Sequence, residues 1–235
     1  PHTLSDEQLG FIKGRSHLVP EFDPGPPTSR ERELRTEMAR LIRRAYDHTL
    51  FTSTEGTFSC RLAADAFLIT PYGVDRKQIR REDIVLVRDG MRERGKVPSR
   101  SALLHREIYA RHPTVEAVLI AHPPSVMAFG VAHEPFNTRT IPESYVMLRE
   151  IPLLEYGAQF NDRERVASMI GPATPVVIVE NDCVIVAGGS LLEAFDRLEV
   201  AEFSARSVIS AGAIGPVTSI DDERAKELDR AFGIG

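Results

Sequence analysis

The chain has 235 residues, of which 42% are hydrophobic, enough to build the core of one medium-sized domain or two small ones. Charged residues make up 27% of the sequence, and acidic residues exceed basic ones to give a formal net charge of -5. This balance leaves no positive surplus to neutralise phosphate groups, so nucleic acid is not an expected partner.

Membrane insertion and secretion are not predicted either. No apolar run approaches the roughly 18 residues of a membrane-spanning helix, and no positive head precedes an apolar stretch at the N-terminus. The two cysteines, Cys60 and Cys183, have neither metal-site spacing nor the spacing of a disulfide framework. A reducing, cytoplasmic location is therefore the simplest expectation.

Residues 1–27 are predicted to form an irregular arm that precedes a single domain of residues 28–235. The stretch EFDPGPPT, residues 21–28, is too rich in proline for a helix or a central strand. Two interpretations stay open for the arm. It is either a loosely packed tail or a strap that packs on its own domain or on a neighbouring subunit.

The first helix is predicted to begin at Thr28, because Thr28 and Glu31 have the spacing of a capping box. It is predicted to end near Asp47. Apolar residues that recur at helical intervals define its buried face: Leu34, Met38, Leu41, Ile42 and Ala45.

Short strands are predicted after this helix, within FTSTEGTFSCRL, AFLITPYGV, DIVLVRDG, VEAVLIAH, PVVIVEND and CVIVAGG. Further helices are predicted over Ser101–Arg111, over residues 190–211 with a capping box at Ser190 and Glu193, and over residues 219–232. Several successive strands lie too close together for crossover helices, so much of the sheet must be antiparallel. We therefore predict one α/β domain. Neither a G-x-G-x-x-G nor a Walker loop occurs, so nucleotide binding has little support.

The order of these segments resembles the class II aldolase/adducin family. The resemblance rests on FLITPYGV, EDIVLV, KVPSRSALLHREIY, HPTVEAVLIAHPP and VIVENDCVIVAGGSLLEAF, and it covers roughly residues 30–215. It implies a three-layer α/β/α sandwich with a central, mainly antiparallel sheet. It also implies assembly as a homotetramer with active sites at subunit interfaces.

The enzymes of this family use a divalent metal, usually zinc, held by three histidines, together with a glutamate that acts as acid and base. The resemblance places the histidine positions at Ile120, His122 and Asp182, and the glutamate position at Ser101. Isoleucine cannot bind a metal, and aspartate prefers different ions from imidazole. Two alternatives follow: a rebuilt site in which His122 and Asp182 hold Zn or Mn, or a site without metal.

The phosphate-binding segments of the family imply a pocket for a small anionic molecule. Arg100 stands where the family has a serine, and its planar guanidinium suits phosphate or carboxylate. The alternative for Arg100 is an ion pair with Glu55. The residues implied at this pocket are Gly56, Thr57, Tyr72, Gly73, Ser99, Arg100 and Ser101.

Three other residues have one chemical and one structural interpretation each. Glu143 is the best remaining carboxylate for acid/base catalysis, and with Arg139 and Tyr145 it either lines the pocket or holds a subunit interface. Cys183 is either a nucleophile activated by His122 or a small buried hydrophobe, and the second interpretation is favoured. His105 is expected to pack or form hydrogen bonds rather than bind a metal.

Two functions remain at this point. The first is a divergent lyase that cleaves a carbon–carbon bond or decarboxylates a small phosphorylated or carboxylated compound, with His122 and Glu143 as its catalytic candidates. The second is a non-catalytic oligomer that binds a ligand or acts as a scaffold, like the adducin head.

Overall fold

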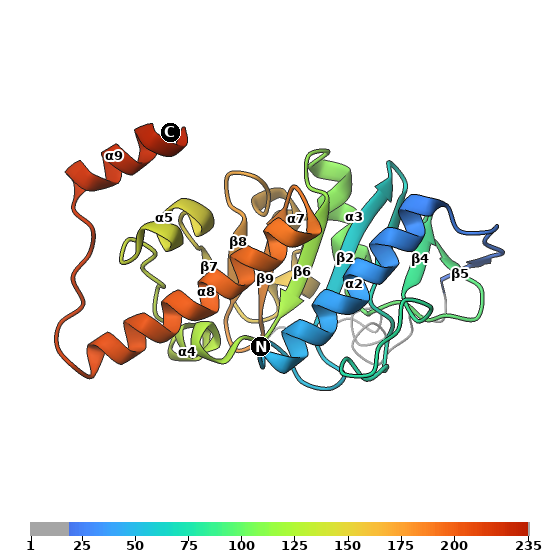
Figure 1. The fold of residues 1–235 in the computed structure, drawn as a ribbon, viewed down its shortest axis with the longest axis horizontal. Coiled ribbons are helices and arrows are strands. Elements are labelled where there is room, and N and C mark those ends of the chain that lie inside the picture. Colours follow the sequence, from blue (N-terminus) through green and yellow to red (C-terminus); the bar gives the residue numbers. More distant parts are fainter. Residues whose placement is uncertain (1–18, 235) are drawn as a thin grey trace.

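A computed structural model defines residues 19–234, and the first 18 residues of the predicted arm lie outside the described part. The described residues form a nine-stranded sheet in the order β1-β5-β4-β3-β2-β6-β9-β8-β7 (Figure 1). The strands are β1 Glu21–Phe22, β2 Thr57–Ala63, β3 Ala66–Ile69, β4 Val85–Arg88, β5 Met91–Glu93, β6 Ala117–Ala121, β7 Leu153–Leu154, β8 Val176–Val179 and β9 Cys183–Gly188.

The predicted antiparallel character of the sheet is confirmed. Neighbouring strands run antiparallel throughout the centre of the sheet, and only the outer pairs β1/β5 and β7/β8 are parallel. The strands β8 and β9 form the predicted hairpin, whose turn places Asn181 at a φ of 53°.

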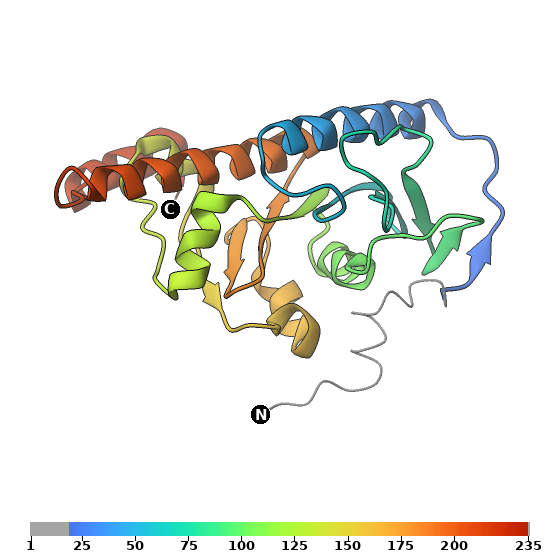
Figure 2. The ribbon, with the colours of Figure 1, turned by 90° about the horizontal axis from the view of Figure 1, so that it is seen from below.

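Helices cover both faces of the sheet (Figure 2). The helices α2, α4, α5 and α8 contribute side chains to one apolar cluster. The helices α3, α6 and α7 contribute to a second cluster on the opposite face of the sheet. The fold is therefore the expected three-layer α/β/α sandwich. The helices are α2 Ser29–Asp47, α3 Ala102–Arg111, α4 Pro124–Ala132, α5 Pro142–Leu148, α6 Ala158–Asn161, α7 Arg163–Met169, α8 Leu191–Gly212 and α9 Asp222–Phe232.

The predicted caps of the two long helices are present. The side chain of Thr28 accepts a hydrogen bond from the backbone N–H of Glu31 at 3.1 Å, at the start of α2. The side chain of Ser190 accepts from the N–H of Glu193 at 3.1 Å, at the start of α8. Each bond satisfies a backbone donor that the first helical turn leaves without a partner.

Several elements depart from the prediction. Within the predicted arm, Glu21 and Phe22 form a short strand that pairs in parallel with β5 at the edge of the sheet. Prolines are tolerated beside an edge strand, because one side of that strand needs no backbone hydrogen-bond donors. The helices α4 to α7 and the strands β5 and β7 were not expected. Every helix of residues 19–234 is too short or too polar to cross a lipid bilayer.

Candidate functional site

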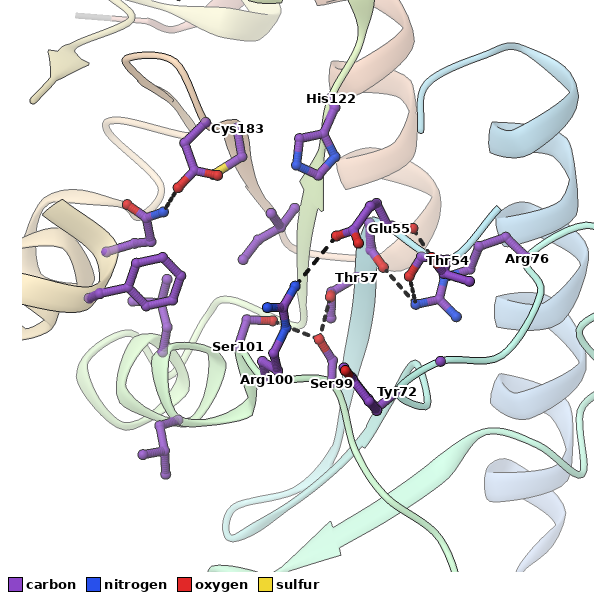
Figure 3. A pocket seen from close by; sticks show the side chains of 18 of the residues that line it. Thr54, Glu55, Thr57, Tyr72, Arg76, Ser99, Arg100, Ser101, His122 and Cys183 are labelled. Atoms are coloured by element: carbon purple, nitrogen blue, oxygen red, sulfur yellow. Dashed lines mark hydrogen bonds and ion pairs between the residues drawn. The ribbon is translucent and has the colours of Figure 1, made fainter. Parts of the chain in front are cut away.

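A cavity of about 610 Å³ opens where β6 ends and where β2 and β9 begin (Figure 3). Antiparallel pairing brings these three strand ends together, because Thr57 of β2 is the register partner of Ile120 of β6. The cavity lies on the α3 side of the sheet. Its lining residues are Thr54, Glu55, Gly56, Thr57, Tyr72, Gly73, Arg76, Ser99, Arg100, Ser101, Leu103, Leu104, Ile120, His122, Gln159, Phe160, Arg163, Asp182 and Cys183.

All seven residues of the predicted anion pocket line this cavity, as do His122 and Asp182. Hydroxyl groups connect the segments that the sequence separates. Thr57 Oγ1 lies 2.6 Å from Ser99 Oγ, which lies 3.2 Å from Ser101 Oγ. Hydroxyls can donate to an anion, so this chain of three side chains presents a polar floor that suits phosphate or carboxylate.

Arg100 lies beside this polar floor and contacts both Glu55 and the ring of Tyr72. Its Nη2 is 3.7 Å from Glu55 Oε2, and its guanidinium carbon lies 5.9 Å from the centre of the Tyr72 ring (Figure 3). The predicted alternative of an ion pair with Glu55 is therefore present. The side chain of Arg100 is 34% exposed and that of Glu55 is 53% exposed, so the pair is partly solvated and weak enough to yield to a ligand.

The turn before β2 requires glycine at position 56. Gly56 has a φ of +78°, a conformation that other residues rarely adopt. A Cβ atom at this position would also lie 2.4 Å from the ring of Phe51. The turn therefore brings its backbone to the cavity wall without a side chain in the way.

Arg76, which was not predicted from the sequence, is 2% exposed and lines the cavity behind this turn. Its guanidinium donates hydrogen bonds to the backbone carbonyls of Thr54, Glu55 and Gly56 at 2.9, 3.2 and 3.2 Å. Only the proximity of an arginine to the TPYG segment could have drawn attention to it.

His122 and Asp182 occupy another part of the cavity wall. The backbone N–H of His122 donates to the carbonyl of Leu50 at 2.8 Å, which fixes the end of β6. Burial lowers the pKa of His122, while the charges of Asp182 and Glu55 oppose that shift. The imidazole is therefore neutral at pH 7 and able to accept a proton.

The residues at the family's metal position do not fit a zinc site with three histidines. Ile120 offers no donor atom, and the carboxylate of Asp182 accepts a hydrogen bond from Gln159 Nε2. Within residues 19–234, no group of three or more His, Cys, Asp or Glu side chains is arranged to hold a metal ion. Catalytic zinc ordinarily has three protein ligands.

Glu143, Arg139 and Tyr145 are not brought into the cavity, contrary to the pocket-lining interpretation. Glu143 is exposed on α5, which packs on the face of the sheet opposite to α3. Arg139 Nη2 and the Tyr145 hydroxyl donate to Asp222 and Asp229 of α9 at 2.7 and 2.8 Å. Catalysis by Glu143 in the cavity of its own chain has no geometric support.

The structure supports the packing interpretations of Cys183 and His105. Cys183 is 2% exposed, and burial raises the pKa of its thiol well above the ordinary value, which disfavours the nucleophilic thiolate. His105 is fully buried, and its Nδ1 lies 2.6 Å from Ser59 Oγ.

Comparison with known proteins agrees with this architecture. The family model for the class II aldolase and adducin N-terminal domain matches residues 36–209. A methylthioribulose-1-phosphate dehydratase of Acidiphilium cryptum (strain JF-5) is 32% identical over 190 residues, which are 74% of this chain and 87% of that protein. An L-fuculose phosphate aldolase of Methanococcus maripaludis is 25% identical over 170 residues, which are 71% of this chain and 91% of that protein.

Among solved structures, YgbL of Klebsiella pneumoniae superimposes with a TM-score of 0.75 at 25% identity, covering 84% of this chain and 98% of that one. A central antiparallel sheet between helical layers, with a polar cavity at the strand ends, defines an α/β sandwich of the aldolase type. The chain belongs to the class II aldolase and adducin family.

Proposed function

We propose that the protein is a divergent lyase that acts on a small phosphorylated or carboxylated compound without the three-histidine zinc centre. The observation that carries the proposal is the convergence of Arg100 with the hydroxyls of Thr57, Ser99 and Ser101 in one cavity that also contains His122. The names of two relatives, a dehydratase and an aldolase of sugar phosphates, support the same substrate class.

In this proposal the two walls of the cavity have separate tasks. The hydroxyl floor and Arg100 bind the anionic group and thereby orient the rest of the substrate. The neutral imidazole of His122 accepts a proton from the substrate as the carbon bond breaks, and returns it to the product. A carbon–carbon cleavage fits this division, because the hydroxyl that becomes a carbonyl gives up the proton and the carbanion left behind takes it. A decarboxylation releases CO2 and no proton, so it would need His122 in the protonated form, as the donor to the carbanion.

The presence of Ser101 in place of the family's glutamate favours a second candidate function. Of the described residues, the acids that line the cavity are Glu55 and Asp182, and each already contacts a partner, Arg100 and Gln159. A cavity so poor in available acids suits a non-catalytic, ligand-binding or scaffolding oligomer, the use implied by the adducin part of the family.

Binding of inorganic phosphate tests the anion site that the lyase proposal requires. Isothermal titration calorimetry should detect phosphate binding that Arg100→Ala weakens at least tenfold, because about 1.4 kcal/mol corresponds to one decade and charged hydrogen bonds exceed that value. Arg165→Ala is the matched control, since Arg165 pairs with Glu155 at 3.0 Å outside the cavity.

Turnover then separates the two functions. We expect carbon–carbon cleavage of L-fuculose 1-phosphate, lost in His122→Gln with phosphate affinity retained. Phosphate binding without turnover of this compound would favour the non-catalytic oligomer, and no phosphate binding would refute the anion site.

The metal part of the proposal has its own experiment. The double variant Ile120→His with Asp182→His should raise the zinc content of the purified protein toward one ion per chain, because it adds two imidazoles beside His122. Elemental analysis measures the zinc. Stoichiometric zinc in the unaltered protein that disappears in His122→Ala would contradict the proposal, as would a folded double variant with no gain.

A further inference from the structure

The most unusual buried charge at the cavity is that of Arg76. Its side chain is among the largest fully buried ones of the described residues, and its hydrogen bonds go to backbone carbonyls rather than to a carboxylate. Burial lowers the pKa of Arg76 to about 10, and it remains a cation at neutral pH. A buried cation that is compensated mainly by dipoles is costly unless an anion comes near.

The hydrogen bonds of Arg76 also set the direction of the neighbouring peptide groups. In a trans peptide the carbonyl and the following N–H point in opposite directions. Because the carbonyls of Thr54 and Glu55 face Arg76, the N–H groups of Glu55 and Gly56 face away from it. Among residues 19–234, no backbone or side-chain acceptor is paired with either N–H.

This turn lies between Arg76 and the polar floor. Figure 3 shows Thr54 and Glu55 with Arg76 on one side and with Arg100 and Ser99 on the other. Arg76 also joins two loops, because its N–H donates to the carbonyl of Ser53 at 2.8 Å and its Nη1 donates to that of Val74 at 2.6 Å. Its single side chain therefore holds the turn before β2 against the loop that carries Tyr72 and Gly73.

We propose that Arg76 is a positioning residue for the anion site: it holds the Thr54–Gly56 carbonyls on one side so that the Glu55 and Gly56 N–H groups face the bound anion on the other. Successive N–H groups that point into a concave turn bind anions, and the positive charge of the buried guanidinium behind them adds attraction. Arg76 acts through the turn and need not touch the ligand. This inference rests on the proposed anion site.

Titration calorimetry with inorganic phosphate tests the inference on three variants of the full chain. We expect Arg76→Gln, which keeps an amide donor and removes the charge and the fork, to weaken phosphate binding at least tenfold. Arg76→Lys should restore part of the affinity, since it returns the charge without the planar fork. Arg43→Gln is the matched control, because Arg43 also donates to a loop carbonyl, that of Ile79 at 2.7 Å, but does not line the cavity.

Thermal unfolding of the same variants distinguishes positioning from general stabilisation. A residue that only stabilises the fold would lower Tm in Arg76→Gln and leave the phosphate Kd of the folded protein unchanged, and that result would overturn the inference. Failure of the unaltered protein to bind phosphate would refute the anion site itself, which is a different outcome.

Hydrogen exchange of the unaltered protein keeps the inference testable where a variant fails to fold. Saturating phosphate should slow exchange of the Glu55 and Gly56 amides at least tenfold, with no change at the Asp89–Gly90 turn, which lies outside the cavity. Phosphate binding that leaves both amides unprotected would show that they do not face the anion.

Discussion

At the scale of single residues, Glu55 is the group that competes with a ligand for Arg100. Its carboxylate lies 3.7 Å from Arg100 and repels any anion that enters the cavity. We expect Glu55→Gln to tighten phosphate binding several-fold, since it removes both the competing ion pair and a like charge, in titration calorimetry at low ionic strength. Glu155→Gln, which removes the partner of Arg165 outside the cavity, should leave the affinity unchanged. Equal or weaker binding by Glu55→Gln would contradict this account.

The burial of His105 makes the stability of the fold depend on pH. Burial lowers the pKa of His105 from 6.5 to about 3. Between these two pH values the imidazole binds a proton in the unfolded chain but not in the folded chain. The free energy of unfolding therefore has its full value above about pH 6.5 and decreases as the pH falls below it. The loss between pH 7 and pH 5 should be about 2 kcal/mol.

Denaturant unfolding across that pH range measures this loss. His105→Gln, which has no titrating imidazole, should show a flatter dependence of the unfolding free energy on pH than the unaltered protein. An unchanged slope in His105→Gln would rule out His105 as the source.

The site residues differ in how well a sequence predicts them. Ser99, Arg100 and His122 follow recognisable strand ends and turns, and the structure brings them together as expected. Arg76 was not predicted, because its proposed role depends on which backbone carbonyls the folded turn directs toward it. No spacing of residue types in the sequence reveals the direction of those carbonyls. Glu143 was selected as the best remaining carboxylate in a segment expected near the pocket or a subunit interface, and it lies on a helix of the opposite face.

At the scale of elements, the contact between β9 and α8 depends on the absence of a side chain at Gly188. A Cβ atom there would lie 2.6 Å from the backbone nitrogen of Ala194 and 3.0 Å from its Cβ, at a fully buried position of α8. We expect Gly188→Ala to lower the free energy of unfolding by about 1–3 kcal/mol, the usual cost of overpacking, in denaturant titrations. Gly212→Ala is the control, because nothing lies within 4 Å of a Cβ there and alanine is the better helix former. Equal effects of the two substitutions would contradict the close-approach argument.

The elements that the sequence predicts are those with a clear period or cap. The helices α2 and α8 have both, and the central strands are buried apolar runs bounded by turn residues. The helix α4 was not predicted for two reasons. It is largely apolar, so it shows no amphipathic period, and it begins at Pro124. Proline is tolerated in the first turn of a helix, but in a sequence it usually indicates a helix end. The helices α5 and α7 have seven residues each, too few to establish a helical period.

At the scale of the whole molecule, the long helix α8 leaves apolar side chains uncovered. Leu192 and Phe203 of α8 are 54% and 68% exposed, and Ile214, in the turn that follows the helix, is 91% exposed. Leu192 and Phe203 are 11 residues apart, close to three helical turns, so they lie on one side of the helix, and we call this pair the α8 stripe. Beyond α8 the chain runs along one end of the molecule to α9 (Figure 1).

Exposed stripes of large apolar residues favour contact with another protein surface, and a second copy of this chain is the partner that the expected homotetramer supplies. We expect light scattering coupled to size-exclusion chromatography to give four times the monomer mass for the unaltered protein and a lower mass for Phe203→Glu. A glutamate in the stripe would have to lose its hydration on assembly, whereas Phe203 gains from burial. Tyr156→Glu is the control, since Tyr156 is equally exposed at 68% and lies outside α8. A monomeric unaltered protein would refute the tetramer, and a Phe203→Glu variant that keeps the full mass would place the subunit contact on another surface.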